Sequence, residues 1–296
     1  MQQQKVTAPD ILAAKGQRRL AMLTASDYPT GLLADAAGAD MVLVGDSLAM
    51  VALGHEDTLS VTMDEMLHHC RAVARGAKRA LVVGDLPFMS YQPSVETAVR
   101  NAGRYLAEGG ARAVKMEGGR DFAPHARAMV RAGIPVMGHI GLTPQHIANL
   151  GGFRAQGRTA EAVRLLLEDA RAMAEAGCFA LVIEAVPAEA SAHLTAAVPM
   201  PTIGIGAGPH CDGQVLVMHD VLGLFDRFTP RFVKPYAKLG EQAREALEAY
   251  CREVREGVFP DHAHSFHLKE EERRAVDAMF GATEGGADRG RGPDHA

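Results

Sequence analysis

Short, almost wholly apolar runs alternate with longer amphipathic stretches along most of this chain. Apolar runs of this length, without a polar residue at every second position, are typical of parallel strands buried on both faces. Most of the amphipathic stretches end at glycine, a common signal for the C-terminal end of a helix. We therefore expect strands at 20–25, 41–46, 80–85, 112–117, 134–139, 179–184 and 201–208, with a helix after each of the first six.

The eighth strand is the least obvious part of the repeat. Residues 215–218 have strand composition, but they follow the seventh strand too closely to leave room for a crossover helix. We therefore place a helix at about 213–223, the last strand at 231–234 and the final helix at 238–256. Because neighbouring parallel strands need a crossover connection, eight strand–helix repeats predict a closed (β/α)₈ TIM barrel.

This barrel accounts for most of the 296 residues, and we expect residues 1–267 to form a single (β/α)₈ catalytic domain. Residues 268–296 then form a charged C-terminal extension. Its first part, 268–274, is expected to be helical. The part beyond Ala282 has too few apolar residues to offset the entropy of ordering, so we expect it to be disordered.

Composition narrows the class of protein. The chain has 47% hydrophobic and 23% charged residues, as ordinary globular proteins have. Its net charge of -5 argues against a nucleic-acid-binding surface, which needs clustered Lys and Arg. No apolar run approaches the roughly 18 residues of a membrane span, and no signal-peptide pattern opens the chain. The four cysteines form no closely spaced pair, so we expect a soluble, cytoplasmic protein.

Three acids stand at the ends of consecutive predicted strands, namely Asp46, Asp85 and Glu117. Reactive groups of such barrels lie at the C-terminal strand ends, so these side chains should be neighbours at the barrel mouth. Their hard oxygen atoms suit Mg²⁺ better than Zn²⁺. Each acid alone could instead cap a helix or pair with a basic residue. Three like charges so close would, however, repel one another without a cation or proton between them.

Lys115 lies two residues before Glu117, so the period-2 alternation of a strand points both side chains into the barrel interior. A buried lysine needs an anionic partner. That partner could be Asp85 or Glu117, or it could be the carboxylate or keto oxygen of a substrate. Ser47 could hydrogen-bond to the same carboxylate or could only cap the next helix.

Two more ionisable residues end later strands, His139 and Glu184. Glu184 follows a purely apolar strand across the mouth from the three acids, where it could act as a general base. His139 could do the same or could only support a loop. A metal that polarises a 2-oxo acid, opposite a carboxylate base, describes proton abstraction next to a carbonyl group.

Seven short motifs mark the chain: TASDYP at 24–29, VGDSL at 44–48, DLPF at 85–88, VKMEGG at 114–119, GHIGLTPQ at 138–145, QGR at 156–158 and GIGAG at 204–208. In this order they resemble the ketopantoate hydroxymethyltransferase (3-methyl-2-oxobutanoate hydroxymethyltransferase) family of pantothenate and coenzyme A biosynthesis. The resemblance runs from about residue 5 to His267. It implies a barrel like those of the phosphoenolpyruvate/pyruvate superfamily.

The resemblance implies a reaction in which 3-methyl-2-oxobutanoate loses a proton from C3 and takes a one-carbon unit from 5,10-methylenetetrahydrofolate, giving 2-dehydropantoate. Glu184 resembles the proton acceptor of this family. The resemblance also implies one Mg²⁺ per subunit and a large homo-oligomer, commonly a decamer.

The same resemblance assigns the remaining site residues. Asp46, Asp85 and Glu117 resemble the Mg²⁺ ligands, partly through water. Asp46, Ser47, Asp85 and Lys115 resemble the contacts to the oxo acid.

Two other readings remain open on the sequence. A different Mg²⁺-dependent 2-oxo-acid enzyme, of the phosphoenolpyruvate mutase or isocitrate lyase type, would have a reactive cysteine in a lid loop, and neither Cys178 nor Cys211 lies in such a loop. A non-catalytic barrel that binds a metabolite would be expected to lack at least one of the site acids.

Overall fold

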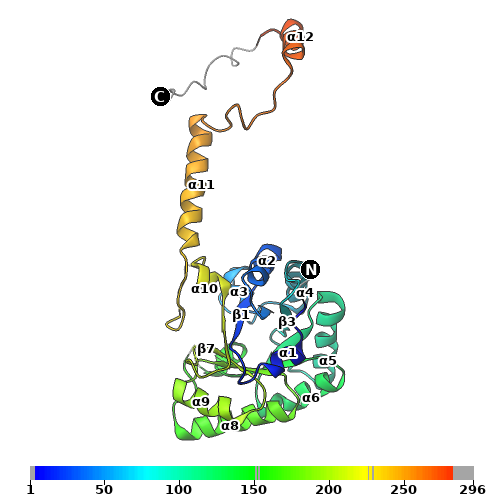
Figure 1. Cartoon of the computed structure of the whole chain (residues 1–296), viewed down its shortest axis with the longest axis vertical. Helices are drawn as coiled ribbons and strands as arrows, with labels where there is room; N and C mark the ends of the chain where they lie inside the picture. Colours follow the sequence, from blue (N-terminus) through cyan, green and yellow to red (C-terminus); the bar gives the residue numbers. More distant parts are fainter. Residues whose placement is uncertain (1–3, 151, 153, 226, 229, 283–296) are drawn as a thin grey trace. The chain divides into compact units, whose positions relative to one another are not determined.

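The computed structural model describes residues 4–150, 152, 154–225, 227–228 and 230–282. Eight parallel strands form a barrel that closes by pairing of the first strand with the last, which confirms the predicted (β/α)₈ class (Figure 1). The strands are β1 (Leu20–Thr24), β2 (Met41–Val44), β3 (Leu81–Asp85), β4 (Ala113–Glu117), β5 (Val136–Gly141), β6 (Ala180–Glu184), β7 (Thr202–Ile205) and β8 (Gly213–Leu216).

Helices connect most of these strands and cover the barrel. Several begin at a residue whose side chain caps the helix, as Asp27 and Thr62 do by accepting hydrogen bonds from backbone amides of the first turn. The helices are α1 (Ala8–Ala13), α2 (Tyr28–Ala36), α3 (Leu48–Val51), α4 (Met63–Gly76), α5 (Val95–Arg104), α6 (Ala123–Arg131), α7 (Ile147–Leu150), α8 (Ala160–Glu175), α9 (Ala188–Ala197) and α10 (Met218–Leu222), with the π-helical η1 (Tyr105–Gly109) and the 3₁₀-helical η2 (Arg120–Phe122) and η3 (Pro144–His146).

The alternation of side chains along the strands builds two apolar cores. One phase, which includes Leu81 and Val83, belongs to a core inside the barrel, and the other, which includes Val82, packs against the helices. The inward phase continues at the strand ends into charged residues. Asp85 follows Leu81 and Val83 in this phase, and Lys115 follows Ala113. The same periodicity that fills the barrel therefore delivers its charged groups to the mouth.

The eighth strand lies earlier than we predicted. Residues 213–216 form β8, whereas residues 231–234 form no strand, and the predicted helix at 213–223 is reduced to α10. Our assumption that a helix separates β7 from β8 was wrong, because residues 206–212 make the connection without one. Gly206 and Gly208 allow this short path, since both have positive φ values of 63° and 75°.

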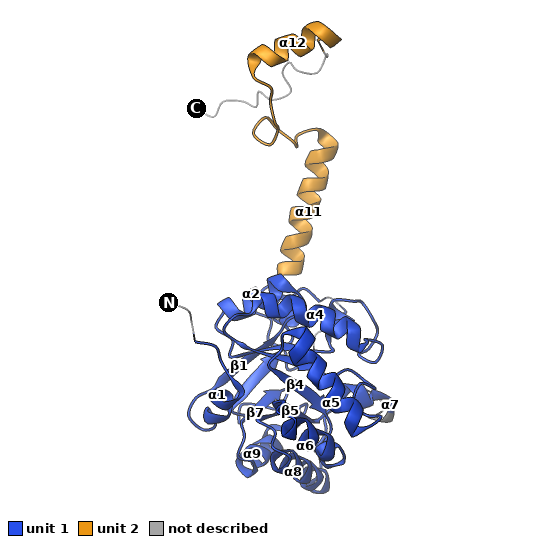
Figure 2. Cartoon of the chain, turned by 90° about the vertical axis from the view of Figure 1, so that its right-hand side faces the viewer, with its two compact units in different colours: residues 1–237 blue, residues 238–296 orange. Residues whose placement is uncertain are grey.

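The chain divides into two compact units, Met1–Ala237 and Lys238–Ala296 (Figure 2). The second unit contains α11 (Leu239–Glu256) and α12 (Glu270–Phe280), and neither helix has a buried residue. This division precedes the domain boundary that we place at residue 267, and that boundary stays a prediction. The expected disorder beyond Ala282 concerns residues 283–296, which lie outside the described part of the chain.

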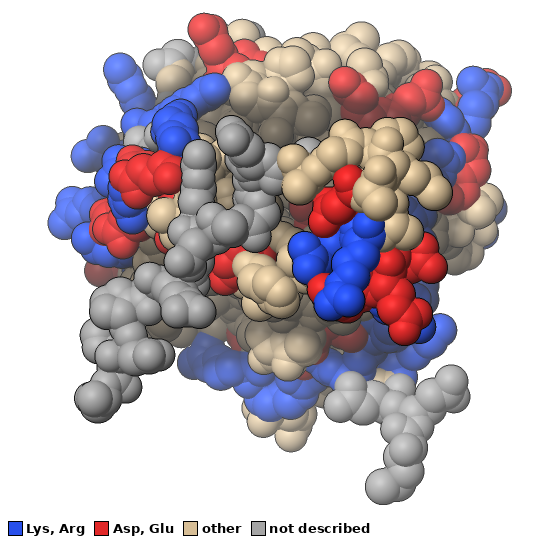
Figure 3. Space-filling model, turned by 90° about the horizontal axis from the view of Figure 1, so that it is seen from above, with Lys and Arg blue, Asp and Glu red and all other residues tan. Residues whose placement is uncertain are grey.

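Both Lys or Arg and Asp or Glu side chains are visible in the view of Figure 3. Within the described ranges, no helix is both long enough and apolar enough to cross a membrane.

Candidate active site

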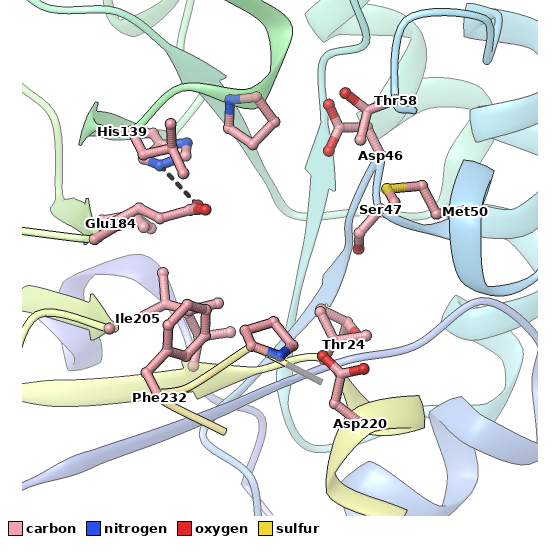
Figure 4. A pocket seen from close by; sticks show the side chains of 18 of the residues that line it. Thr24, Asp46, Ser47, Met50, Thr58, His139, Glu184, Ile205, Asp220 and Phe232 are labelled. Carbon is pink, nitrogen blue, oxygen red and sulfur yellow. Dashed lines mark ion pairs between the residues drawn. The ribbon is translucent and has the colours of Figure 1, made fainter. Parts of the chain in front are cut away.

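The C-terminal strand ends surround a cavity of about 660 Å³ (Figure 4). All seven residues that the sequence singled out line it, so the barrel does bring them together. They are Asp46, Ser47, Asp85, Lys115, Glu117, His139 and Glu184. The volume is within the range of about 300–1,000 Å³ that is typical of small-molecule sites.

Lys115 forms a buried ion pair at the floor of this cavity. Its Nζ lies 2.7 Å from Asp85 Oδ1 and 3.9 Å from Glu117 Oε1, and the paired side chains are almost wholly inaccessible to solvent. Burial opposes a charge on Lys115, but Asp85, Glu117 and Asp46 outweigh it and raise the pKa of the ammonium group. Asp85 is therefore the anionic partner of Lys115 within the protein. The lysine side chain remains protonated.

Asp46 is the acid of the cluster with the least compensation. Its backbone amide donates to Asp85 Oδ2 at 3.1 Å, which holds the two carboxyl groups close together. Burial and the neighbouring Asp85 raise the pKa of the Asp46 carboxyl well above its usual range. A cation bound near Asp46 would favour the ionised form of this carboxyl group.

His139 lies between two acids. Its Nδ1 is 3.4 Å from Glu117 Oε1, and its Nε2 is 3.3 Å from Glu184 Oε2, the contact drawn in Figure 4. Burial and Lys115 oppose protonation of the ring, but the two carboxylates outweigh them and raise the pKa of His139 to about 9. A cationic imidazole in this place forms an ion pair with Glu184 at the wall of the cavity.

The backbone around Glu184 is shaped to present this side chain. Ala185, which follows it, has a positive φ of 48°, a conformation that costs a residue with a Cβ atom roughly 1–3 kcal/mol. Gly141 on the neighbouring strand has φ +96°, and a Cβ there would lie 2.3 Å from the carbonyl oxygen of Glu184. Strain of this kind persists only where surrounding structure imposes it, as functional sites often do.

Gln145 is a buried hub of the site that our sequence reasoning missed. Its Nε2 donates to Asp46 Oδ2 and to the Leu86 carbonyl, both at 2.9 Å, and its backbone amide donates to Glu117 Oε2 at 3.0 Å. Its Oε1 accepts a hydrogen bond of 2.9 Å from the Tyr91 hydroxyl. A neutral amide thereby fixes two acids that end different strands. Two signals in the sequence point to it, namely its position four residues after the end of β5 and its place as the last residue of the motif at 138–145.

Tyr105 supports the Asp85 strand end from outside the barrel. Its hydroxyl donates to the Asp85 carbonyl, and its ring lies against Gly84. A Cβ at Gly84 would lie 2.3 Å from a ring carbon, so any side chain there would displace the tyrosine. Tyr105 begins the π-helical turn η1, and such turns are frequent at functional sites.

The acids do not form a closed metal cage. In the described ranges, no three His, Cys, Asp or Glu side chains converge closely enough to hold a metal ion by themselves. Mg²⁺ does not require such a cage, because it usually keeps several waters and uses one or two carboxylates. The oxygen-only donor set, with Asp46 held next to Asp85, therefore fits a hydrated Mg²⁺ ion.

The closed barrel defines the broad class, a (β/α)₈ protein, and solved structures of the phosphoenolpyruvate mutase/isocitrate lyase superfamily share its fold. Phosphonopyruvate hydrolase in complex with oxalate and Mg²⁺ has this fold, with a TM-score of 0.56 and 17% identity over 93% of this chain and 99% of that chain. A second solved structure, 2,3-dimethylmalate lyase of that superfamily, gives a TM-score of 0.55 at 16% identity over 92% and 98% of the two chains.

Sequence comparison identifies the family. The model of the ketopantoate hydroxymethyltransferase family matches residues 5–262, and the chain belongs to this family. The 3-methyl-2-oxobutanoate hydroxymethyltransferase of Oleidesulfovibrio alaskensis is 65% identical over 91% of this chain and 93% of its own length. The enzyme of the same name from Syntrophobacter fumaroxidans is 62% identical over 93% and 98%. The family resemblance deduced from the seven motifs is confirmed.

Proposed function

We propose that this chain transfers a hydroxymethyl group from 5,10-methylenetetrahydrofolate to 3-methyl-2-oxobutanoate and so forms 2-dehydropantoate. One observation supports this most directly. Glu184 and His139 face Asp46 and Ser47 across the open space of a single cavity (Figure 4). A base on one side and an anion-binding, metal-binding cluster on the other are what proton abstraction next to a carbonyl group needs.

The oxo acid is assigned to the floor of the cavity, in contact with Asp46, Ser47, Asp85 and Lys115. The Lys115 ammonium group can donate to the substrate carboxylate or keto oxygen while it keeps its bond to Asp85. The Ser47 hydroxyl makes no capping bond to α3, so it is available to the substrate. These donors fix the orientation of C3 relative to Glu184.

Asp46, Asp85 and Glu117 would hold Mg²⁺, partly through water. When bound, the ion would withdraw electrons from the keto oxygen and stabilise the negative charge that develops there. Gln145 keeps two of these acids in place through its bonds to Asp46 and Glu117. An oriented set of ligands reduces the reorganisation that ion binding requires.

Glu184 accepts the proton from C3, and the electron pair of the broken C–H bond passes towards the keto oxygen. C3 then forms a carbon–carbon bond to the methylene carbon of the folate donor. Both C–N bonds of that carbon break in the overall reaction, water supplies the hydroxyl group, and tetrahydrofolate leaves. His139, 3.3 Å from Glu184, steadies the carboxylate throughout.

The first step can be measured without the folate donor. We expect purified protein with Mg²⁺ to exchange the C3 hydrogen of 3-methyl-2-oxobutanoate with deuterium, and to form 2-dehydropantoate once the donor is added. Chelation of the metal should lower the exchange rate by about a hundredfold or more, because several kcal/mol of charge stabilisation are lost. Proton NMR in D₂O measures the exchange, and mass spectrometry measures the product.

Calorimetric titration with Mg²⁺ distinguishes the acids that bind the ion from acids that do not. The Asp46→Ala variant should bind the ion far more weakly than wild type. The Asp121→Asn variant, which changes an exposed acid, should bind the ion as tightly as wild type. Unchanged Mg²⁺ affinity in Asp46→Ala would remove Asp46 from the ligand set. Wild-type protein that shows neither exchange nor product would refute the proposed function.

We propose that the chain forms a homo-oligomer. The family resemblance implies a decamer. Support comes from α11, where Leu247, Tyr250 and Val254 expose 64%, 53% and 45% of their surface on one helical face. Contiguous apolar surface of this kind usually marks an interface. A second copy of the chain would cover it.

The oligomer proposal predicts that Leu247→Glu lowers the assembly mass by at least one dissociation step, because a charge would be buried in the contact. Light scattering of the full chain measures this mass. The matched variant Glu248→Gln, on the same helix, should leave the mass unchanged. A wild-type chain that is monomeric at micromolar concentration would contradict the proposal.

A further inference from the structure

The cavity extends beyond the floor that we assign to the oxo acid. Its polar floor is formed by the strand ends described above, whereas Ile205, Val217 and Phe232 contribute an apolar wall. In Figure 4 Asp220 and Phe232 lie on one side of the open space, and His139 and Asp46 lie on the other. A cavity of about 660 Å³ is much larger than a small oxo acid requires. The apolar side is therefore available to a second, larger ligand.

Aromatic rings dominate this wall. Phe225, Phe228 and Phe232 all line the cavity, and the first two are packed edge to face, with ring centroids 6.0 Å apart. Gly206 makes room for the third, because a Cβ there would lie 2.6 Å from the Phe232 ring. The glycine-rich end of β7 thus admits an aromatic side chain to the mouth. A planar ring system could lie against such a wall.

Asp220 is a carboxylate within this apolar surface. Its side chain has no hydrogen-bond donor among the described residues, whereas the floor acids Asp85 and Glu117 are both paired. Burial alone raises the pKa of the Asp220 carboxyl. Its position is fixed by the start of α10, where the Met218 amide donates to the Thr24 hydroxyl at 3.0 Å. A half-buried carboxylate held in place without a donor is suited to a ligand that brings N–H groups.

We propose that Asp220 and the phenylalanine wall bind the pterin ring of the tetrahydrofolate donor, with the N–H edge of its 2-amino-4-oxopyrimidine on the carboxylate. That edge presents two parallel donors, which match the two oxygens of one carboxylate. The rim arginines Arg154 and Arg231 also line the cavity and are exposed, so they can meet the glutamate carboxylates of the donor's tail. The inference rests on the proposed function and names the half of the cavity that its second substrate occupies.

The experiment compares tetrahydrofolate, its 5,10-methylene form and one analogue on wild type and on Asp220→Asn. Tetrahydrofolate binding and the KM for 5,10-methylenetetrahydrofolate are measured for wild type and for Asp220→Asn, which keeps the size of the side chain. Loss of a charge-assisted pair of hydrogen bonds should raise the Kd for tetrahydrofolate and the KM for 5,10-methylenetetrahydrofolate by roughly 10- to 100-fold. The KM for 3-methyl-2-oxobutanoate and the C3 exchange rate without folate should stay at the wild-type values. An analogue of tetrahydrofolate whose 2-amino group is replaced by methyl should bind wild type more weakly than tetrahydrofolate does. The Asp220→Asn variant should bind the analogue and tetrahydrofolate with equal affinity.

The outcomes separate this inference from the proposed function. Wild type that forms product, together with Asp220→Asn of unchanged donor affinity, would overturn the pterin assignment alone. If Asp220→Asn loses affinity for tetrahydrofolate and for the 2-methyl analogue by the same factor, or loses the folate-free exchange, Asp220 only supports the fold. Either result would also overturn the assignment. Wild type that neither binds tetrahydrofolate nor forms product would overturn the proposed function and this inference with it. Asp121→Asn is the matched exposed control.

Discussion

Glu184→Gln is expected to lower the C3 exchange rate of 3-methyl-2-oxobutanoate by about 10²- to 10⁴-fold, the usual contribution of a positioned general base. The amide keeps the size of the carboxylate but cannot accept the proton. Glu184 lies at the cavity wall with 16% of its side chain exposed, and its loss leaves the floor acids and Lys115 untouched. Substrate and Mg²⁺ affinity, measured by calorimetry, should therefore stay close to wild type.

A matched control lies five residues further along the chain. Glu189→Gln changes an exposed acid in the first turn of α9 and should exchange at the wild-type rate. Exchange at full rate in Glu184→Gln would move the base elsewhere. His139 would then be the next residue to test, because the loss of the Glu184 charge removes one of the two carboxylates that raise the pKa of the ring and keep it protonated.

Lys115→Met is expected to lower the free energy of unfolding by about 3–5 kcal/mol, the usual cost of leaving one partner of a buried ion pair alone. The two side chains of the pair are 5% and 1% exposed, so water cannot replace the lost ammonium group at Asp85. Methionine is similar in length and leaves no large cavity. Urea unfolding in the presence of a chelator measures the effect without a contribution from bound metal.

The double variant Asp85→Asn/Lys115→Met tests whether the lone charge causes the loss. Removal of both charges should restore part of the stability, because a neutral amide is less costly to bury than an unpaired carboxylate. Lys78→Met, which changes an exposed lysine, should be nearly neutral. If the double variant is no more stable than Lys115→Met, the loss comes from packing and not from charge.

Much of the barrel is predictable because its strands carry their own signal. Strands β2 to β6 are apolar runs with a polar end, and the predicted segments overlap all five. The error at β8 has a physical origin. Residues 215–218 have strand composition, but we assumed that a helix separates every pair of consecutive strands and therefore placed the last strand later in the chain. Two glycines with positive φ allow the chain to pass between neighbouring strands without a helix, and hydrophobic periodicity does not report such a path.

The charged part of the site was predictable for the same reason. Asp85 and Glu184 are the last inward-facing residues of their strands, and strand alternation alone places them at the mouth. Gln145 and Tyr91 were not predicted as site residues because neutral polar residues outside the strands carry no periodic signal. Asp220 was missed because it lies in α10, just after the strand that we misplaced. Tertiary structure, and not sequence pattern, gives these three residues their place.

Barrel closure has a consequence for how the protein is made. β1 meets β8 through pairs such as Leu20 with Gly213, a separation of about 190 residues, and contacts this distant along a chain form slowly. Thr24 on one side of this seam and Asp220 just beyond the other both line the cavity. The half of the cavity that we assign to the pterin ring is therefore complete only when the seam closes. Ligands that bind in the cavity would favour the closed barrel over the open chain by mass action.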